Sequence, residues 1–381
     1  MNPVLYAWGV RALFFAAGLL FATWGVHVPT VKGHYGLGEQ ALAVAMLAGG
    51  VGAVGGLTQA GRLIGRFGPR KVALVSGCLC AASIGLLLAF HTIAALLLVM
   101  VAFGLANSLF DVSVNVAASD LEARAGRPLM SGFHGMFSLG GMAGAAGGAA
   151  LLSAGVVPWH HLVGATAVGV ALVVFGCSTM PRAKKPEEGA GGHAFVLPRG
   201  TLLLIGILAS LGLIAEGAMY DWSVLYVKQE LLADAGTAAL GYAAFSGAMA
   251  AARFGGDWVR ARLSSALLVR ASGLLAAAGM TLSLLTSSPL VALLGFALVG
   301  LGFANIVPVL FSAAGRQTDM SASMAISAIT TIGYAGILAG PALIGFVAHA
   351  ASLHLAFGAL ACGMLLVSLN ARLGGSRIVR P

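Results

Sequence analysis

The sequence predicts an all-α membrane protein whose twelve transmembrane helices form two pseudo-symmetric six-helix bundles. Of the 381 residues, 59% are hydrophobic and only 9% are charged, whereas a soluble domain carries roughly a quarter charged residues. The apolar runs are long and lack the alternating polarity of β-barrel strands, so they indicate helices. Several short motifs also recur at a near-constant offset, which indicates a duplicated unit.

Each predicted span is a run of about 20 mostly apolar residues, the length that crosses a bilayer. The spans cover residues 5–29, 39–61, 71–91, 93–118, 129–154, 160–180, 200–227, 236–258, 265–286, 289–314, 322–347 and 353–370. The longest connection, "PRAKKPEEGAGGHAFVLPRG", divides the chain into an N-terminal bundle (1–180), a cytoplasmic linker (181–199) and a C-terminal bundle (200–381). The first segment lacks a charged n-region and a small-residue cleavage site, so we interpret it as a span and not as a signal peptide.

Basic residues concentrate in every second connection, at 62–71, 124–127, 182–199, 260–262, 316 and 372–380. The alternate connections hold only Lys32 and Lys228. The positive-inside rule therefore places both termini in the cytoplasm. This placement explains the net charge of +9 without a nucleic-acid partner. We expect a monomer whose partners are the lipid bilayer, a small solute and protons.

The two halves share motifs at the same spacing. "GLAN" ends at Asn107 and "GFAN" ends at Asn305, 198 residues later. "TWG" begins at Thr23 and "DWS" begins at Asp221, again 198 residues later. These matches predict a six-span unit duplicated in parallel, an arrangement that places a substrate path between the halves near the bilayer midplane.

Span 4 carries a polar stripe of residues spaced four apart on one side of the helix. The stripe consists of Asn107, Asp111, Asn115 and Ser119. A charge at the bilayer centre costs about 2.5–3.5 kcal/mol on insertion scales, so Asp111 must face protein or water. Because a buried carboxylate can bind and release a proton near neutral pH, we predict Asp111 as the proton-coupling residue. Asn107 and Asn115 are predicted substrate ligands, and the alternative for both is hydrogen bonding to a neighbouring helix.

Span 5 places His134 and Ser138 one turn apart near its start. A rise of 1.5 Å per residue puts Asp111 about 10 Å and His134 about 8 Å from the same face of the membrane. Because spans 4 and 5 are adjacent in sequence, we predict that Asp111 and His134 interact in a proton relay. The alternative is a histidine packed against a backbone carbonyl. Ser138 is a predicted substrate ligand.

Span 7 reads "AEGAMYDWS" and is the second polar span. Glu216 is the predicted second coupling carboxylate, and Tyr220 lies on its face of the helix. The other candidate substrate ligands are Thr23, Trp24, His27, Tyr220, Asp221, Trp222, Asn305 and Tyr334. Trp24 and Trp222 either belong to an aromatic belt at the membrane interface or stack on a sugar or cyclitol ring.

The remaining polar residues of the spans receive structural interpretations. Pro308 is expected to kink its helix. Arg11, Arg253 and Arg270 are expected to extend from helix ends towards water. The four cysteines lie in apolar runs and are interpreted as small core residues, so we expect no metal site and no cofactor.

Over its whole length the sequence resembles the major facilitator superfamily. The connection after span 2, "GRLIGRFGPRK", is similar to that superfamily's G-x-x-x-D-R-x-G-x-R-R signature. The matching residues include Gly61, Arg66, Gly68 and Arg70. Gly65 stands in place of the signature's acid, whereas the second-half counterpart "RFGGDWVRAR" keeps an acid, Asp257. The resemblance implies a major facilitator fold in which these residues form a gate at the cytoplasmic side.

The spacing of Asp111 and Asn115 resembles the Glu-x-x-x-Asn of fucose–proton symporters. "FHGMFSLGG", "EGAMYDWS" and "DVSVN" together look more like a bacterial inner-membrane subgroup that includes rhizopine-transport proteins. The resemblance implies alternating-access transport of a small polar solute, sugar- or cyclitol-like, coupled to protons through Asp111. The symporters carry a second acid at the outer end of span 1, where this sequence has His27 and Lys32, so Glu216 is expected to take that role.

Two rival functions remain beside this one. The first is a proton-driven exporter of drugs or metabolites; the antiporters of the superfamily show G-x-x-x-G-P-x-x-G-G in span 5, and "GGMAGAAGGAA" has the glycines without the proline. The second is a sensor, which the lack of a sizeable soluble domain disfavours. An enzyme is the least favoured class, because the sequence has no phosphate loop, metal cluster or nucleophile triad.

Overall fold

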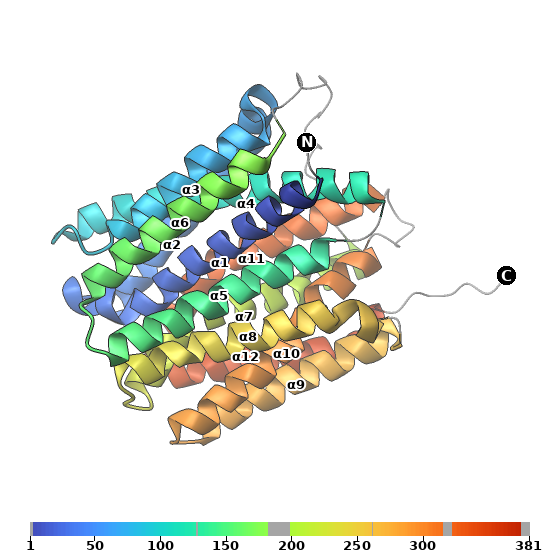
Figure 1. Ribbon diagram of the computed structural model, residues 1–381. Coiled ribbons are helices and arrows are strands. Elements are labelled where there is room, and N and C mark those ends of the chain that lie inside the picture. The colour runs from blue at the N-terminus through green and yellow to red at the C-terminus, as the bar shows by residue number, and fades with distance from the viewer. Residues whose placement is uncertain (1–2, 127–128, 182–198, 261, 315–321, 375–381) are drawn as a thin grey trace.

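A computed structural model describes residues 3–126, 129–181, 199–260, 262–314 and 322–374. In this part of the chain twelve α-helices follow one another, and the prediction of an all-α protein of twelve helices is confirmed (Figure 1). Their bounds are α1 Pro3–His34, α2 Glu39–Phe67, α3 Pro69–Gly85, α4 Ile93–Ala125, α5 Met130–Ser153, α6 Pro158–Thr179, α7 Gly200–Gln229, α8 Ala235–Arg260, α9 Ser265–Leu285, α10 Pro289–Ala314, α11 Ala322–Ala350 and α12 Leu353–Leu369.

The helices extend beyond the apolar runs wherever polar helix formers continue them. The fourth apolar run was predicted to stop at 118, yet α4 continues through "SDLEARA" to Ala125. It ends at Gly126, whose φ of 64° is left-handed and therefore suits glycine. The opposite deviation occurs in α3, which ends at Gly85 although the apolar run continues to 91. A hydropathy window finds the membrane-buried part of a helix and not its capped ends.

By length and apolar composition, eight of the described helices qualify as membrane spans: α1, α2, α4, α5, α6, α7, α9 and α10. Residues 339–350 of α11 and all of α12 form shorter apolar helices. α3 has 17 residues, or about 26 Å at 1.5 Å per residue. α8 carries Arg253, Asp257 and Arg260 in its last eight positions. The charges of α8 are thus concentrated at one end of the bundle.

The helices alternate in direction, so the bundle has two distinct ends (Figure 1). We call the end at which α1 begins and α12 ends the near end. The near end also holds the connections α2–α3, α4–α5 and α8–α9. The opposite end, where α1 joins α2 and α7 joins α8, is the far end.

Helix packing repeats between the first six helices and the last six. α1 packs on α5 as α7 packs on α11, and α2 packs on α4 as α8 packs on α10. The contacts between the two sets follow the same rule, since α5 packs on α8 and α11 packs on α2. Shifting every helix by six reproduces each of these pairs, as expected of a duplicated six-helix unit.

Glycine allows the closest of these contacts. On α2 and α4, Gly52 faces the backbone carbonyl of Val101, and Gly104 faces that of Gly49. A Cβ atom at Gly52 or Gly104 would overlap the opposing backbone, which cannot move aside like a side chain. Small residues at helix crossings are the usual solution in lipid, where apolar burial drives helix association only weakly.

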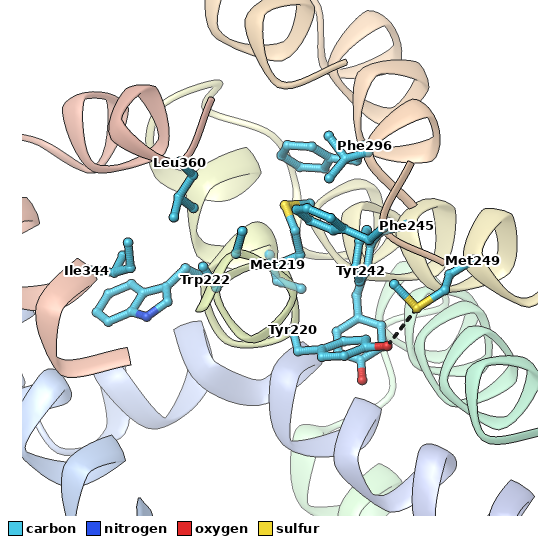
Figure 2. Packing of buried hydrophobic residues seen from close by; sticks show 14 of the residues in the cluster. Met219, Tyr220, Trp222, Tyr242, Phe245, Met249, Phe296, Ile344 and Leu360 are labelled. Atoms are coloured by element: carbon cyan, nitrogen blue, oxygen red, sulfur yellow. Dashed lines mark hydrogen bonds between the residues drawn. The ribbon is translucent and has the colours of Figure 1, made fainter. Parts of the chain in front are cut away.

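Several of the largest buried side chains lie around α7 (Figure 2). Trp222 points to one side of α7, towards Ile344 of α11, and it is fully buried. Tyr220 points to the other side, where its ring lies 5.1 Å from that of Tyr242 and 5.1 Å from that of Phe245. α7 is therefore enclosed on both sides, and its polar residues are held between helices.

Candidate functional site

The polar stripe of α4 starts inside the protein and ends at its surface. Asn115 donates its amide hydrogens to the backbone oxygen of Asp111 at 2.9 Å and to its carboxylate Oδ1 at 3.1 Å. Asn107 is half-buried, and its amide has no hydrogen-bond partner among the described residues. Ser119 is exposed. Asp111 is thus held by a donor of its own helix, one turn away, as the four-residue spacing predicts.

The predicted pair of Asp111 and His134 is not formed in this structure. The ring of His134 packs edge-on against Phe14 of α1, with ring centroids 5.3 Å apart. No hydrogen bond joins Asp111 to His134 in the described residues. The reason is the packing order: α4 lies against α2 and α3, whereas α5 lies against α1 and α8, and α4 and α5 barely touch. Helices adjacent in sequence need not be neighbours in space.

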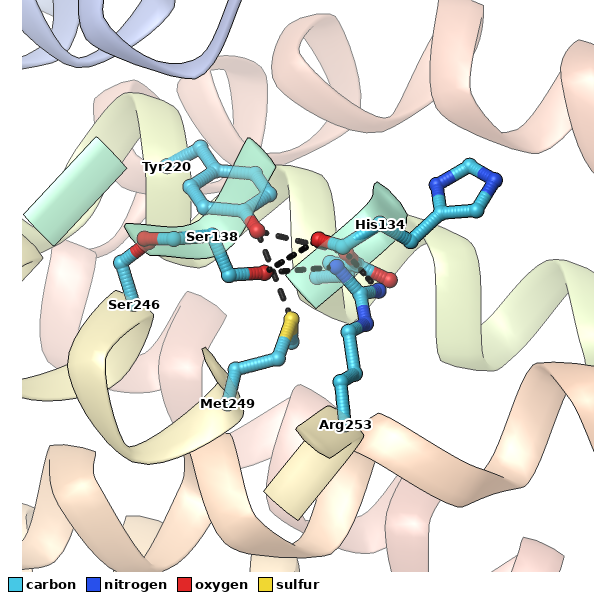
Figure 3. A network of polar contacts seen from close by, with 7 residues as sticks. His134, Ser138, Tyr220, Ser246, Met249 and Arg253 are labelled. Carbon is cyan, nitrogen blue, oxygen red and sulfur yellow. Dashed lines mark hydrogen bonds and ion pairs between the residues drawn. The ribbon is translucent and has the colours of Figure 1, made fainter. Parts of the chain in front are cut away.

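A largely buried ion pair joins α7 to α8 (Figure 3). Arg253 Nη2 donates to Glu216 Oε1 at 3.1 Å, and the two side chains are only 16% and 15% exposed. Tyr220 donates its hydroxyl towards the same Oε1 at 3.4 Å. The interpretation that Arg253 extends to water is therefore wrong. A charge in a span is stabilised by an opposite charge, and the nearest carboxylate at its depth is Glu216.

The same arginine connects the two halves of the protein. Arg253 Nη1 donates to the hydroxyl of Ser138 on α5 at 2.8 Å. Ser246 of α8 donates to the backbone oxygen of Ser138, also at 2.8 Å. His134 joins this group through its backbone carbonyl, which accepts from Ser138, while its ring points away (Figure 3). Of the predicted site residues, Glu216, Tyr220 and Ser138 are thus brought together, and Arg253 is the member that the sequence did not reveal.

A second polar contact crosses the halves closer to the far end. Trp24 of α1 donates its indole N–H to Asp221 Oδ1 of α7 at 3.1 Å. Trp24 is 2% exposed and Trp222 is fully buried, so neither belongs to an aromatic belt. Gly25 leaves room for this contact, because a Cβ there would meet the backbone oxygen of Tyr220 at 2.6 Å. The two "TW" and "DW" motifs that the repeat relates therefore face each other.

The other residues predicted from α1 are buried within the N-terminal half. His27 is fully buried, and its Nε2 lies 2.8 Å from Nδ1 of His161 on α6. Its Nδ1 lies 3.3 Å from the hydroxyl of Thr30. Thr23 is also buried and donates to the backbone oxygen of Leu19. His27 and Thr23 therefore bond within their own half, unlike Trp24.

The second-half candidates are only partly described. Asn305 of α10 is 8% exposed, and its amide has no hydrogen-bond partner among the described residues. Its Oδ1 faces α8, where a Cβ at Gly256 would lie 3.4 Å away. Pro308 lies exposed inside α10, which continues past it. The side chains of Tyr334 and Asp257 lie outside the described residues.

The near-end motif forms the joint between α2 and α3. Gly68 has a φ of 79° and donates its N–H to the backbone oxygen of Ile64, so it closes α2 in a conformation that favours glycine. Arg70 donates to the backbone oxygen of Met180 at 3.4 Å, beyond the end of α6. Gly61 and Arg66 are exposed. The motif thus ties α3 to α6.

Outside the spans, Asp234 precedes α8 at the far end. Its carboxylate accepts the hydroxyl and the backbone N–H of Thr237, and these hydrogen bonds hold the pKa of Asp234 below its usual value. This is a cap of the helix and not a binding site. The described residues contain no group of three metal-ligating side chains.

Comparison with known proteins identifies relatives over nearly the whole chain. The profile of the Major Facilitator Superfamily matches residues 11–333. An uncharacterised MFS-type transporter of Yersinia pestis is 38% identical over 362 residues, which are 95% of this chain and 94% of that protein. The membrane protein MosC of Rhizobium meliloti is 33% identical over 344 residues, 89% of this chain and 83% of its own length. The crystal structure of a D-xylose-proton symporter superposes with a TM-score of 0.72 at 14% identity, over 96% of this chain and 97% of that one.

Proposed function

The chain belongs to the major facilitator superfamily and is a transporter rather than an enzyme, and from this premise we propose that it moves a small polar solute by alternating access, coupled to protons. The proposed solute is sugar- or cyclitol-like, and the proposed location is the inner membrane of a bacterium, with the near end in the cytoplasm. The basic connections at 62–71 and 124–127 support this orientation, because both lie at the near end.

One observation carries the proposal: a buried polar network spans both halves of the molecule. Ser138 comes from the first six helices, and Glu216 and Arg253 come from the last six. Polar and charged groups inside a membrane protein are expensive and mark solute and proton paths. Substrate sites of such duplicated folds lie between the halves near the midplane. The network therefore lies where a solute has to pass.

The unpartnered amides at equivalent positions of the repeat support a hydroxylated solute. Asn107 and Asn305 each offer donors and an acceptor that no described residue uses. Trp24 and Tyr220 are buried at the boundary of the halves, and we propose that they present flat apolar surface to the solute when the halves separate. Hydroxyl groups at a ring's rim and C–H groups on its face match such a lining. The shared fold with a D-xylose-proton symporter is consistent with this solute class.

Proton coupling is assigned to Asp111 and Glu216. Asp111 is the carboxylate of the polar stripe, and the amide of Asn115 donates a hydrogen bond to it. Glu216 differs because Arg253 already neutralises it. A proton on Asp111 removes a charge from the membrane interior, which lowers the barrier to movement of the empty or loaded protein. His134 remains a proposed helper, although it does not contact Asp111 here.

The test is proton-driven uptake into proteoliposomes by the wild type and by Asp111→Asn. We expect the variant to lose accumulation driven by a pH gradient while exchange of solute across the membrane continues. The matched control is Asp120→Asn on the same helix, whose carboxylate pairs with Arg124 at 41% exposure. Accumulation that survives in Asp111→Asn would remove the coupling role from Asp111. His134→Ala with an unchanged pH profile would remove the helper role from His134.

The solute class is tested on the same preparation by thermal stabilisation. Sugars, cyclitols and amphiphilic drugs are added to the purified protein. A response to hydroxylated solutes supports the proposal, since bound ligand stabilises the folded state by mass action. A response to drugs alone would identify the protein as a drug exporter and overturn the sugar-like assignment.

A further inference from the structure

A cavity of about 170 Å³ opens at the near end between α1, α5 and α8. Arg11 of α1 lines one side of it, and Arg253 of α8 lines another. The first turn of α5 forms the remaining wall with Ser131, Gly132 and Phe133. The cavity therefore lies between the two halves of the protein, directly on the near-end side of the Ser138 and Glu216 contacts made by Arg253.

The two arginines differ in how their charges are balanced. Arg253 has one carboxylate partner, Glu216. Arg11 has none among the described residues; its guanidinium lies 5.3 Å from the ring centre of Trp8 and 5.7 Å from that of Phe133. Guanidinium groups remain charged at any physiological pH. Among the described residues, Arg11 thus brings to the cavity a positive charge that no carboxylate pairs with in a salt bridge.

Two acids of the neighbouring helix α4 form other contacts and no salt bridge with Arg11. Glu122 of α4 does not line the cavity, and its Oε2 accepts the backbone N–H groups of Leu129 and Met130 at 2.6 and 2.9 Å. Asp120 pairs with Arg124 at 2.9 Å. An uncompensated charge in a membrane protein is unfavourable. The cavity is therefore suited to receive a negatively charged group from outside the chain.

We propose that this cavity binds the carboxylate of the transported solute between Arg11 and Arg253, so that the solute is a sugar-like carboxylic acid. The inference rests on the proposed function and narrows its solute class. A carboxylate matches the planar fork of a guanidinium, which donates two parallel hydrogen bonds to it.

The two arginines also come from opposite halves, which gives the bound carboxylate a second effect. With the cavity empty, Arg11 and Arg253 repel each other across the boundary of the halves. A carboxylate between them replaces this repulsion by attraction to both. Acid binding therefore favours the arrangement in which α1 and α8 are close at the near end, and an uncharged sugar does not.

The test compares matched acid and neutral solutes on the purified full-length protein. D-gluconate and D-glucuronate are set against D-glucose and myo-inositol, and affinity is measured by titration calorimetry and thermal stabilisation. We expect the acids to bind at least tenfold more tightly than their neutral counterparts. In Arg11→Gln the affinity for acids should fall ten- to hundredfold, the range expected for a charge-assisted hydrogen bond, while neutral solutes are unaffected. Arg62→Gln, an exposed arginine of the near end, is the charge control.

A second pair of variants tests the cavity without removing a charge. A Cβ at Gly132 meets open space, so Gly132→Leu places a side chain beside or in the cavity without a clash. Gly147 of the same helix is equally open and lies away from the cavity, so Gly147→Leu is the matched control. We expect only Gly132→Leu to lose acid binding.

Three outcomes decide the matter. Acids that bind more tightly than neutral solutes and lose this advantage in Arg11→Gln support the inference. Equal binding of acids and neutral solutes, or acid binding that Arg11→Gln leaves unchanged, overturns it. Acid binding that depends on Arg11 without uptake of any solute into proteoliposomes refutes the transport proposal and leaves the carboxylate site standing.

Discussion

The ion pair of Arg253 and Glu216 is the contact whose loss should be most visible. Its N···O distance is 3.1 Å, and both side chains are about 15% exposed. Two unit charges about 4 Å apart attract each other by roughly 4 kcal/mol at an effective dielectric constant of 20. The slight exposure screens part of this attraction, so we expect a coupling free energy of about 2–3 kcal/mol.

A double-mutant cycle measures that coupling directly. Arg253→Gln alone leaves Glu216 as an unpaired charge in the membrane, and Glu216→Gln alone leaves Arg253 unpaired; each should cost about 3 kcal/mol of stability. The double variant contains no unpaired charge, so it should lose less than the sum of the two. Thermal unfolding in detergent provides the readout, with a shift of roughly 2–4 °C per kcal/mol for a unit of six-helix size.

The control for the double-mutant cycle is an arginine that makes no buried ion pair among the described residues. Arg270→Gln removes an exposed arginine of α9 and should leave the unfolding temperature almost unchanged. If the two single variants lose little stability, or if their effects simply add in the double variant, Arg253 and Glu216 do not stabilise each other. The proposed neutralisation of Glu216 would then have no basis.

Three further predictions concern contacts elsewhere in the bundle. Trp24→Phe keeps an aromatic ring but removes the N–H that donates to Asp221, and the buried carboxylate oxygen left without this hydrogen bond should cost about 1–3 kcal/mol of stability. The loss is measured as a lower unfolding temperature. Phe103→Leu, an apolar change beside Trp24, is the control, and its effect should not depend on pH as that of Trp24→Phe does. A Cβ at Gly236 would overlap the hydroxyl of Ser153 in the other half. Gly236→Cys combined with Ser153→Cys should therefore form a disulfide on oxidation and stop transport until a reductant is added. Transport by the fully oxidised pair would show that the far end does not need to open. Asp234→Ala should lose about 1 kcal/mol at neutral pH, and because the pKa of Asp234 is lowered in the folded protein the difference from wild type should shrink as the pH falls through that value, whereas a pH-independent loss would argue against capping by the charged form.

The helices were predictable because each apolar run is long enough to cross a membrane by itself. The predicted starts of α9 at 265, α10 at 289 and α12 at 353 coincide with those of the structure. Ser264 and Ser352 cap two of these helices by accepting the N–H three residues on, which is a local sequence signal. Ends such as Ala125 of α4 were missed because capping and polar helix formers, and not hydropathy, decide them.

The buried polar residues could be picked out one by one from the sequence, but their contacts with one another could not. A polar group inside a span is energetically costly, so the sequence indicated Glu216, Ser138 and Asp221 as candidates. Arg253, the partner of Glu216 and Ser138, was missed because it lies only seven residues before the end of α8, where an arginine extending to water was the simpler interpretation. The partner of a buried arginine can be predicted only when the neighbouring helix is known. The same lack of packing order produced the incorrect pairing of Asp111 with His134.

The two carboxylates of α7 are fastened in different directions, and this difference has a consequence for transport. Glu216 and Asp221 are five residues apart, about 7.5 Å along the helix. Glu216 is held by Arg253 of its own half, whereas Asp221 is held by Trp24 of the other half. Separating the halves at the far end must therefore break the contact of Asp221 but can leave that of Glu216 intact.

The near-end contact is arranged in the opposite way. Arg253 is the residue that reaches across to Ser138, so separation there strains the arginine and not the carboxylate. The carboxylates of α7 thus contact the other half only towards the far end, through Asp221, whereas on the near-end side the contact between the halves is made by Arg253 of α8.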